Sequence, residues 1–522
     1  MRHAPDERRR LLANLSRAAA AMALGRLFAA PSSGRAAEAP AGDYPFTLGV
    51  ASGMPRPDSV VLWTRLAPQP HAPGGGLPPL PLHLRWELAD DDAFRSGVRW
   101  GTVVVQPEQA HSAHVRVDGL PSGAQFFYRF MTADAVSPIG RTCTAPAADA
   151  AVASLRIALA SCQHYEQGAF VAHREIAARD IDLVLFVGDY IYESSNPRYR
   201  LRAHEGPPPM TLDQYRARHA TYKLDADLRA AHAAHPWIVT WDDHEVENDY
   251  ANDRSPLGLT PAEFLRRRAA AYQAYFEHMP ITPTMAPQGA TMRIHDRYTW
   301  GRLAELFTLD SRQYRDVQAC GEGAGGRVVA PCEALADTSR SVLGNAQERW
   351  LAQGLAASSR RWKLLGMGSQ VSPAGVHGPG FDRIHTDGWD GYPPARERLL
   401  RAMAQAPGGN VLSLGGDVHR HVAAQLRLRG NDSRSPVVAG EFVCSSITSR
   451  GLSESMTALV RASNPDILHA RGDERGYAFI EIDAKGATCD FRATPFPADA
   501  RARLSSQGKF AVEAGVAGVV AG

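Results

Sequence analysis

Metal-binding side chains follow several apolar runs in this chain of 522 residues. The runs end in Ser161-Cys162-Gln163-His164, Gly188-Asp189-Tyr190-Ile191-Tyr192-Glu193, Trp241-Asp242-Asp243-His244-Glu245 with Asn248 and Asp249, Asp310-Ser311-Arg312-Gln313-Tyr314, and Gly416-Asp417-Val418-His419-Arg420-His421. Carboxylates, imidazoles and a thiol form a donor set for hard and borderline cations. Two or more such cations can hold a phosphate ester, activate a water and neutralise phosphoryl charge.

Each of these residues has a simpler explanation when it is taken alone. A strand-end aspartate is more often the cap of the next helix, and a lone histidine is more often structural. Repeated placement after five runs argues for one site, because ligands gather at the carboxyl ends of strands in α/β sheets. The sequence has neither a Walker-type phosphate loop nor a G-x-S-x-G nucleophile elbow. Of the hydrolytic mechanisms considered, metal-assisted hydrolysis therefore remains.

The runs before these residues have the composition of strands buried on both faces. They are LRIALAS, DLVLFVG, WIVTW, LAELFTLD, KLLGMGSQ, VLSLGG and EFVCSSI. Helical patterns lie between them, from Ala169 to Arg179 and in TLDQYRARHATYK, PAEFLRRRAAAYQAYFEH, NAQERWLAQGLAAS and ARERLLRAMAQA. This alternation predicts a layered α/β domain.

Residues 43–146 have a different pattern, in which short strands alternate with turns. The strand-like segments are SVVLWTRL, LHLRWELA, RWGTVVVQ, AHVRVDGL and QFFYRFMTA. Their spacing predicts an all-β sandwich domain, and the tract DGLPSGAQFFYRF resembles the late strands of a fibronectin type III-like module. The segment APAADAAVA is the expected linker to the α/β domain, and residues 501–522 are the expected C-terminal tail.

Composition narrows the class of protein. Hydrophobic residues make up 44% and charged residues 21% of the chain, which excludes collagen-like, coiled-coil and largely disordered proteins. The net charge of +2 argues against a nucleic-acid partner. Residues 1–39 hold seven arginines and three acidic residues, a surplus of four positive charges, so the remaining chain carries −2.

The first 39 residues predict an export signal. Arg8, Arg9 and Arg10 precede a modest apolar stretch, and the small-residue segment GRAAEAPA follows it. This order is typical of a signal peptide for the twin-arginine route, and an alanine-rich helical or disordered extension is the alternative. Arg17 and Arg26 interrupt the apolar stretch, so we expect no membrane anchor. A periplasmic or secreted protein follows from this interpretation.

The motifs SCQ, GDYIYE, WDDHEVEND, LDSRQYR, GGDVHRH and EFVCSSITS occur in this order and resemble those of the PhoD-like alkaline phosphatase/phosphodiesterase family. The opening FTLGVASGMPRPDSVVLWTRLAP resembles the N-terminal domain of the same family. The resemblance implies a four-layer α/β metallophosphoesterase sandwich over residues 152–500, preceded by the fibronectin type III-like all-β domain. It also implies iron(III), calcium and an alkaline optimum.

The resemblance assigns roles to individual residues. The implied metal ligands are Cys162, Asp189, Tyr192, Asp243, Asn248, Asp417 and His419. Within this set, Cys162, Tyr192 and His419 match iron ligands, Asp189 matches the bridging carboxylate, and Asp243, Asn248 and Asp417 match the calcium side. His244 matches a donor to the phosphate or leaving group. A small buried apolar residue is the alternative for Cys162.

Arg312 is a candidate for neutralising the charge of the phosphate, and a buried ion pair is the alternative. Some other positions stay open. His164 could tune the site or support it from further away, and Cys444 could merely fill the core. Trp389, Asp390 and Tyr392 belong either to the pocket or to the core. Cys320 and Cys332 flank a glycine-rich stretch that a disulfide could close, given export.

We therefore expect an exported monomeric hydrolase that cleaves phosphate mono- and diesters by attack of metal-activated hydroxide at phosphorus. Its expected partners are the phosphate ester and the twin-arginine export machinery. One alternative is a phospholipase D-like phosphodiesterase acting on lipid headgroups. The other is a non-catalytic surface-binding protein with a structural metal site, which the many open oxygen ligands oppose because structural sites are usually closed.

Overall fold

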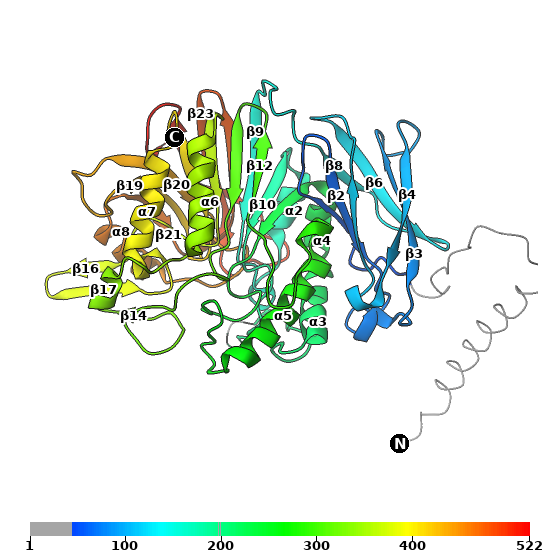
Figure 1. The fold of residues 1–522 in the computed structure, drawn as a ribbon, viewed down its shortest axis with the longest axis horizontal. Helices are drawn as coiled ribbons and strands as arrows, with labels where there is room; N and C mark the ends of the chain where they lie inside the picture. Colours follow the sequence, from blue (N-terminus) through cyan, green and yellow to red (C-terminus); the bar gives the residue numbers. More distant parts are fainter. Residues whose placement is uncertain (1–43, 197, 199, 522) are drawn as a thin grey trace, which may run out of the picture.

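The computed structural model describes residues 44–196, 198 and 200–521. The predicted export signal at 1–39 lies outside the described residues. Figure 1 shows a central pair of sheets between two helical layers, with an all-β part at one end. In the described part of the chain, no helix has the length and apolar character needed to cross a membrane.

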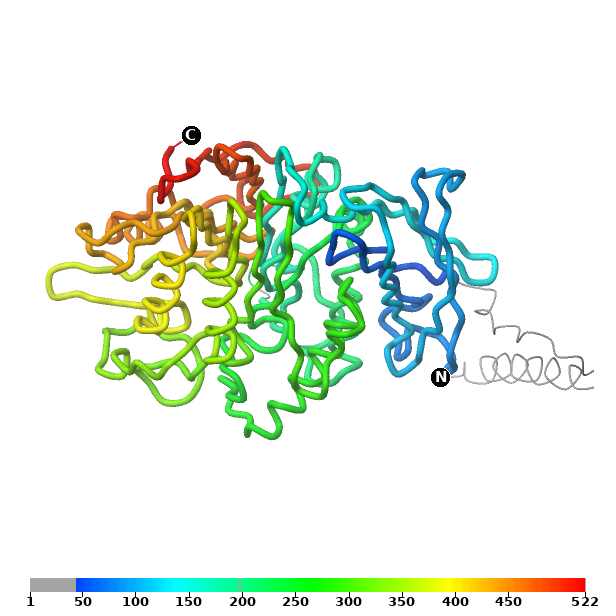
Figure 2. The backbone as a smooth tube through the Cα atoms, turned by 45° about the horizontal axis from the view of Figure 1, so that its top comes forward, coloured from blue at the N-terminus to red at the C-terminus, as the bar shows by residue number. Residues whose placement is uncertain are grey.

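One sheet of the α/β part has parallel strands at its centre: β9 (Ser154–Ala160), β10 (Leu183–Val187) and β11 (Pro236–Thr240). Antiparallel strands β22 (Glu474–Asp483), β23 (Gly486–Pro495), β24 (Ser505–Glu513) and β25 (Val520–Ala521) extend it on one side. Figure 2 shows the C-terminal part of the chain, in red, along the upper edge of the molecule in that view. Residues 505–513 thus belong to the sheet, whereas the sequence predicted a separate tail from 501.

The second sheet has seven strands in the order β12 (Asp296–Trp300), β13 (Ala304–Thr308), β15 (Trp362–Gly366), β18 (Val411–Gly415), β20 (Val437–Val443), β19 (His421–Arg427) and β21 (Ile467–Arg471). Its strands β13, β15, β18 and β20 are parallel neighbours. Their carboxyl ends therefore share one edge, as predicted for strands that carry a common site.

The two sheets pack face to face, and Leu159 and Leu185 share an apolar core with Leu306 and Leu364. A second core fills the space between the seven-stranded sheet and helices α6 (Gly344–Ala357) and α7 (Pro393–Ala404). Helices α2 (Val171–Ala178) and α4 (Ala226–Ala234) cover the other outer face, where His232 of α4 stacks on Trp237 of β11. The predicted four-layer α/β sandwich is confirmed.

The predicted N-terminal all-β domain is also confirmed, and it shares a sheet with the α/β domain. Its strands β1 (Val50–Gly53), β2 (Val60–Arg65) and β5 (Ser112–Val117) extend the ten-stranded sheet, because β1 pairs in parallel with β11. A second sheet of β3 (Leu82–Ala89), β4 (Arg99–Val105), β6 (Gln125–Thr132), β7 (Ala135–Val136) and β8 (Gly140–Cys143) packs against them. One face of the sandwich is thus continuous with the site-bearing sheet.

Two long helices begin where their sequences predict. Helix α3 (Leu212–Lys223) starts with a capping box of Thr211 and Gln214, and α5 (Pro261–His278) with a capping box of Thr260 and Glu263. In each box the threonine and the residue three positions later satisfy backbone N–H groups that the helix leaves open. Local sequence patterns did not predict α4, α8 (Glu454–Ser463), or the small sheet of β14 (Val328–Val329), β16 (Val376–Gly378) and β17 (Phe381–His385).

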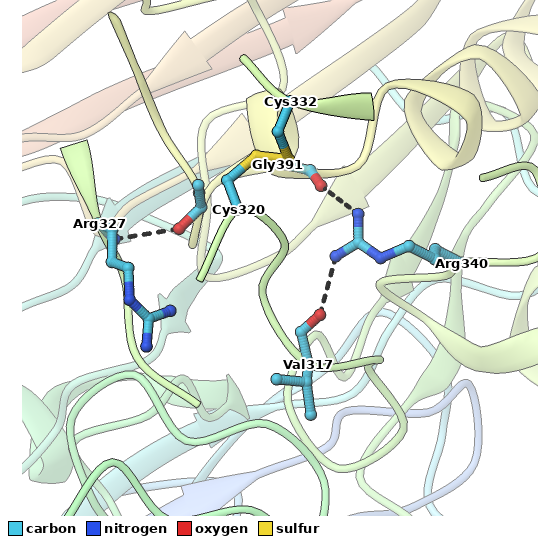
Figure 3. The surroundings of a disulfide bond; sticks show 7 residues. Val317, Cys320, Arg327, Cys332, Arg340 and Gly391 are labelled. Carbon is cyan, nitrogen blue, oxygen red and sulfur yellow. Dashed lines mark hydrogen bonds between the residues drawn. A yellow bond between two sulfur atoms is a disulfide. The ribbon is translucent and has the colours of Figure 1, made fainter. Parts of the chain in front are cut away.

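A disulfide joins Cys320 and Cys332, the pairing that the sequence left open (Figure 3). Arg340 holds the neighbouring loops together by donating to the carbonyl oxygens of Gly391 and Val317, at 2.7 and 2.8 Å. The disulfide loop contains Gly326, whose N–H donates to Asp249 Oδ2 over 2.9 Å. The cross-linked loop therefore reaches the acidic residues described below.

We predict that Gly53→Ala destabilises the α/β domain as well as the β domain. A Cβ at Gly53 would lie 2.5 Å from the carbonyl oxygen of Pro280 and 2.6 Å from that of Trp237, so β1 must shift away from β11. Overpacking of this kind costs about 1–3 kcal/mol. Denaturant unfolding followed by circular dichroism measures the change. Gly378→Ala is the control, because its Cβ would meet nothing within 4 Å. Equal stability of the two variants would contradict the shared sheet.

Candidate metal centre

The residues after the strands meet at one edge of the sandwich in a strained backbone. Cys162, Asp189, Asp417 and His419 have φ values of 59°, 58°, 68° and 52°. Residues other than glycine seldom adopt this left-handed conformation, which persists only where the surrounding structure enforces it. Hydrogen bonds between the strand ends do so here: Cys162 N–H donates to Gly188 O, and Gln163 N–H donates to Asp189 O, each over 3.1 Å.

The first donor group contains Cys162, Asp189 and His419, whose ligand atoms all lie within 4.8 Å of one another. The Tyr192 hydroxyl joins this group, because it donates to Asp189 Oδ2 over 2.8 Å and lies 3.1 Å from His419 Nε2. The Nδ1 of His419 lies 2.7 Å from the carbonyl oxygen of Arg450, so Nδ1 carries the proton and Nε2 is available to a metal. The structure thus brings together the four residues predicted around iron.

The second donor group contains Asp189, Asp243 and His244, again within 4.8 Å. Asp189 belongs to both groups, which is the position that a carboxylate bridging two cations must have. The His244 ring packs against the Tyr192 ring with 4.0 Å between the ring centroids and a tilt of 32°. Its Nδ1 lies 2.7 Å from Glu193 Oε2, which leaves Nε2 directed away from that pair. Sequence reasoning gave Glu193 no role, although it ends the GDYIYE motif.

The third donor group contains Asp243, Asp249 and Asp387. Sequence reasoning assigned no role to Asp249 or Asp387, although Asp249 ends the WDDHEVEND motif and Asp387 opens DGWDGYP. Asp249 also has a positive φ, 58°, and its N–H donates to Asp243 Oδ2 over 2.6 Å. Acidic side chains from two distant segments thus converge beside the second group.

Arg312 lies inside this acidic cluster and is 1% exposed. Its Nε donates to Asp242, and its Nη1 and Nη2 lie 3.0 and 2.9 Å from the two carboxylate oxygens of Asp387. All three guanidinium nitrogens therefore contact carboxylates of the protein. This geometry fits the alternative of a buried ion pair, in which Arg312 orients Asp242 and Asp387.

The remaining predicted residues lie around these groups. Asp417 follows β18 and lines a cavity of about 410 Å³ together with His419. Asn248 is exposed, and its backbone N–H donates to Glu193 Oε1 over 2.9 Å. His164 is buried and packs 4.5 Å from the Tyr192 ring, beside the site.

The residues for which the sequence left a core role or a pocket role open take different positions in the structure. Cys444 is fully buried in the core, with Sγ 3.3 Å from Ser161 Oγ. Trp389 contributes to the second core and also lines the cavity. Asp390 lines the cavity too. Tyr392 is fully buried in the same core.

Comparison with known proteins shows the family of this chain. The family model described as "PhoD-like phosphatase" matches residues 157–491, and the one described as "PhoD-like phosphatase, N-terminal domain" matches residues 30–146. Alkaline phosphatase D of Bacillus subtilis (strain 168) is 42% identical over 484 residues, which cover 90% of this chain and 80% of that protein. The chain belongs to the PhoD-like phosphatase family. The solved structure titled "Structure of PhoD" matches with a TM-score of 0.88 and 40% identity, covering 94% of this chain and 93% of that one.

The electrostatics of this family member favour a cation among the donor groups. Burial raises the pKa of Asp189 well above its ordinary value, and Asp243 and Asp242 add to the rise while His244 opposes it. Burial likewise raises the pKa of Asp417, with contributions from Asp242 and Asp243. Asp189 Oδ1 is buried and has no hydrogen-bond partner among the described residues. A bound cation would satisfy that oxygen and hold both carboxyls ionised, so the residues fit a metal centre.

We predict that Asp189→Asn and Cys162→Ala lose bound metal and at least about a hundredfold in activity, since each removes an anionic ligand. Metal content by plasma mass spectrometry and hydrolysis of a nitrophenyl phosphate measure the two effects. Cys489→Ala is the matched control, because Cys489 is also buried but lies in the core. Full metal content and activity in Cys162→Ala would contradict the predicted thiolate ligand.

Proposed function

We propose that this protein is an exported phosphatase and phosphodiesterase whose centre holds iron(III) and calcium. The observation that carries the proposal is the placement of Asp189 in two adjoining donor groups. Two neighbouring cation sites with a shared carboxylate suit phosphate esters, since both cations can contact one phosphoryl group. Membership of the PhoD-like phosphatase family supports the same reaction class.

The donor types suggest how the metals divide. Cys162, Asp189, Tyr192 and His419 would hold iron(III), since a phenolate and a thiolate suit a highly charged transition metal. Asp189, Asp243, Asn248 and Asp417 would hold calcium, which accepts oxygen ligands in irregular geometry. When bound, these cations supply Lewis acidity, which withdraws charge from the phosphoryl oxygens and makes water more acidic.

His244 would donate a proton to the leaving oxygen. Burial lowers the pKa of His244, but the carboxylates of Glu193, Asp189 and Asp243 raise it more, so the pKa lies well above its ordinary value. These carboxylates therefore favour the protonated imidazole. Glu193 accepts from Nδ1, which would leave Nε2 to face a bound substrate. Arg312, held by Asp242 and Asp387, would keep the second cation's side of the site in place.

Export rests on the sequence of residues 1–39. A twin-arginine signal would carry the protein out of the cytoplasm after folding, and the enzyme would act in the periplasm or outside the cell. The same proposal includes that the protein is a monomer and that the twin-arginine machinery transports it. The disulfide between Cys320 and Cys332 is consistent with an oxidising compartment.

The experiment that tests the function combines metal analysis with a substrate panel. Protein exported by its own signal is assayed on nitrophenyl phosphate, bis-nitrophenyl phosphate and a phosphatidylcholine diester. We expect iron and calcium, a tyrosinate-to-iron absorption band that Tyr192→Phe removes, and turnover of the two soluble esters. Preference for the lipid would favour the phospholipase D-like alternative. A pure, metal-loaded protein that cleaves none of the three would overturn the proposal.

We predict that Glu193→Gln moves the high-pH limb of the kcat profile to lower pH. Glu193 raises the pKa of His244, so its neutralisation lets the imidazole lose its proton at lower pH. Loss of an oriented proton donor also lowers kcat at the optimum by about tenfold or more. Glu481→Gln, at an exposed position, is the control. An unchanged profile would rule out His244 as the donor that Glu193 positions.

A further inference from the structure

The cavity beside the metal centre is larger than a reacting phosphoryl group requires. Its volume is about 410 Å³, and its lining includes Asp417, His419, Arg420, Leu452 and Val460. Pockets that enclose whole small molecules span about 300–1,000 Å³. The cavity therefore has room for the organic part of a phosphate ester whose phosphoryl group lies at the metals.

Arg420 is the unusual residue of this cavity, because its guanidinium is buried without a carboxylate partner. The residue is 5% exposed. Its Nη1 donates to Val418 O over 3.4 Å and its Nη2 to Gln370 Oε1 over 3.1 Å, both neutral acceptors. Its Nε is buried and has no partner within residues 44–521 as described. Arginine is almost never fully buried unless it is paired, and it stays protonated.

Two kinds of buried arginine occur elsewhere in the described part of the chain. Arg218 and Arg475 also lack carboxylate partners, but they donate to backbone carbonyl oxygens and do not line this cavity. Arg312 and Arg315 form ion pairs with Asp387, and Arg267 forms one with Glu247.

The acidic residue that lines the cavity away from the metal centre, Asp390, is already neutralised by Arg396. Burial lowers the pKa of Arg420 to about 10, and Asp417 and Asp390 oppose the fall without forming an ion pair with it. Because Asp417 would hold a cation in the proposed centre, Arg420 keeps a positive charge at the cavity wall.

The surrounding backbone fixes the position of this charge. Arg420 directly follows His419, whose positive φ and hydrogen bond to Arg450 O hold the loop. Directly after it, His421 begins β19 and its Nδ1 accepts from Ser445 N–H over 2.9 Å. The amide of Gln370 is held by Ser372, with Oε1 left to Arg420. The guanidinium is thus preorganised beside the metal centre.

We propose that Arg420 binds a second phosphate group, carried by the alcohol part of the substrate, while the reacting phosphoryl group lies at the metals. A guanidinium presents its donors in a planar fork that matches phosphate oxygens, and Nε is unused. The apolar walls formed by Ala374, Val418, Leu452 and Val460 would hold the carbon chain between the two phosphates. The favoured substrates are esters with two phosphates a few carbon atoms apart. This inference rests on the proposed phosphatase activity.

The test compares propyl phosphate with propane-1,3-diyl bisphosphate, using initial rates of phosphate release by the metal-loaded enzyme. We expect the wild type to prefer the bisphosphate. Arg420→Gln should lower kcat/KM for the bisphosphate by about tenfold or more, because a hydrogen bond to a charged group is lost. The same variant should change propyl phosphate turnover by less than about threefold, and Arg420→Lys should recover part of the preference.

Controls separate the possible failures. Arg434→Gln changes an arginine whose side chain is 92% exposed and should leave both rates unchanged. Thermal unfolding of each variant checks folding, and the ratio of the two rates cancels any general loss of active protein. A wild type without preference, or equal loss on both esters in Arg420→Gln, would overturn the inference. If the metal-loaded wild type cleaves neither ester, the proposed phosphatase function fails instead.

Discussion

The crowding of buried carboxylates at one edge of the sandwich is the constraint on which the rest of the structure depends. Asp189, Asp243 and Asp387 lie in adjoining groups at this edge, and burying anions is unfavourable unless positive charge compensates them. Arg312 and Arg315 compensate Asp387, but Asp189 keeps an oxygen with no partner in the described chain. Cations bound at Asp189 would complete the balance, and the strained strand ends bring the carboxylates to the place where they could be bound.

The strands and helices near the site could be predicted from local patterns. Buried runs such as that of β10 and the capped helix α5 carry strong periodic and end signals, and the structure follows them closely. The pairing of β1 with β11 could not be predicted, because Gly53 and Trp237 are distant in sequence and no local pattern records which edges meet. The strands β14, β16 and β24 were not predicted, for another reason. They are short or mix exposed and half-buried residues, so their apolar alternation is weak.

The donor types of the candidate site could be predicted from the sequence, but the partners that compensate their charges could not. Cys162, Asp189 and His419 follow predicted strands, and the geometry of parallel sheets brings such positions together. Arg312 occupies a motif position that equally suits a phosphate contact, and only its contacts with Asp242 and Asp387 distinguish the two roles. Arg420 carries no sequence signal, because its place at the cavity wall without a carboxylate partner depends on the fold.

The most direct test of the metal centre is anomalous diffraction from crystals of the metal-loaded enzyme, with data collected on both sides of the iron absorption edge. The account predicts an iron peak at coordination distance from Cys162 Sγ, the Asp189 carboxylate, the Tyr192 oxygen and His419 Nε2. It predicts a second peak, insensitive to that edge, on the other side of Asp189 toward Asp243. A fully active enzyme with no metal peak beside Asp189, or with its metals bound elsewhere, would contradict the account.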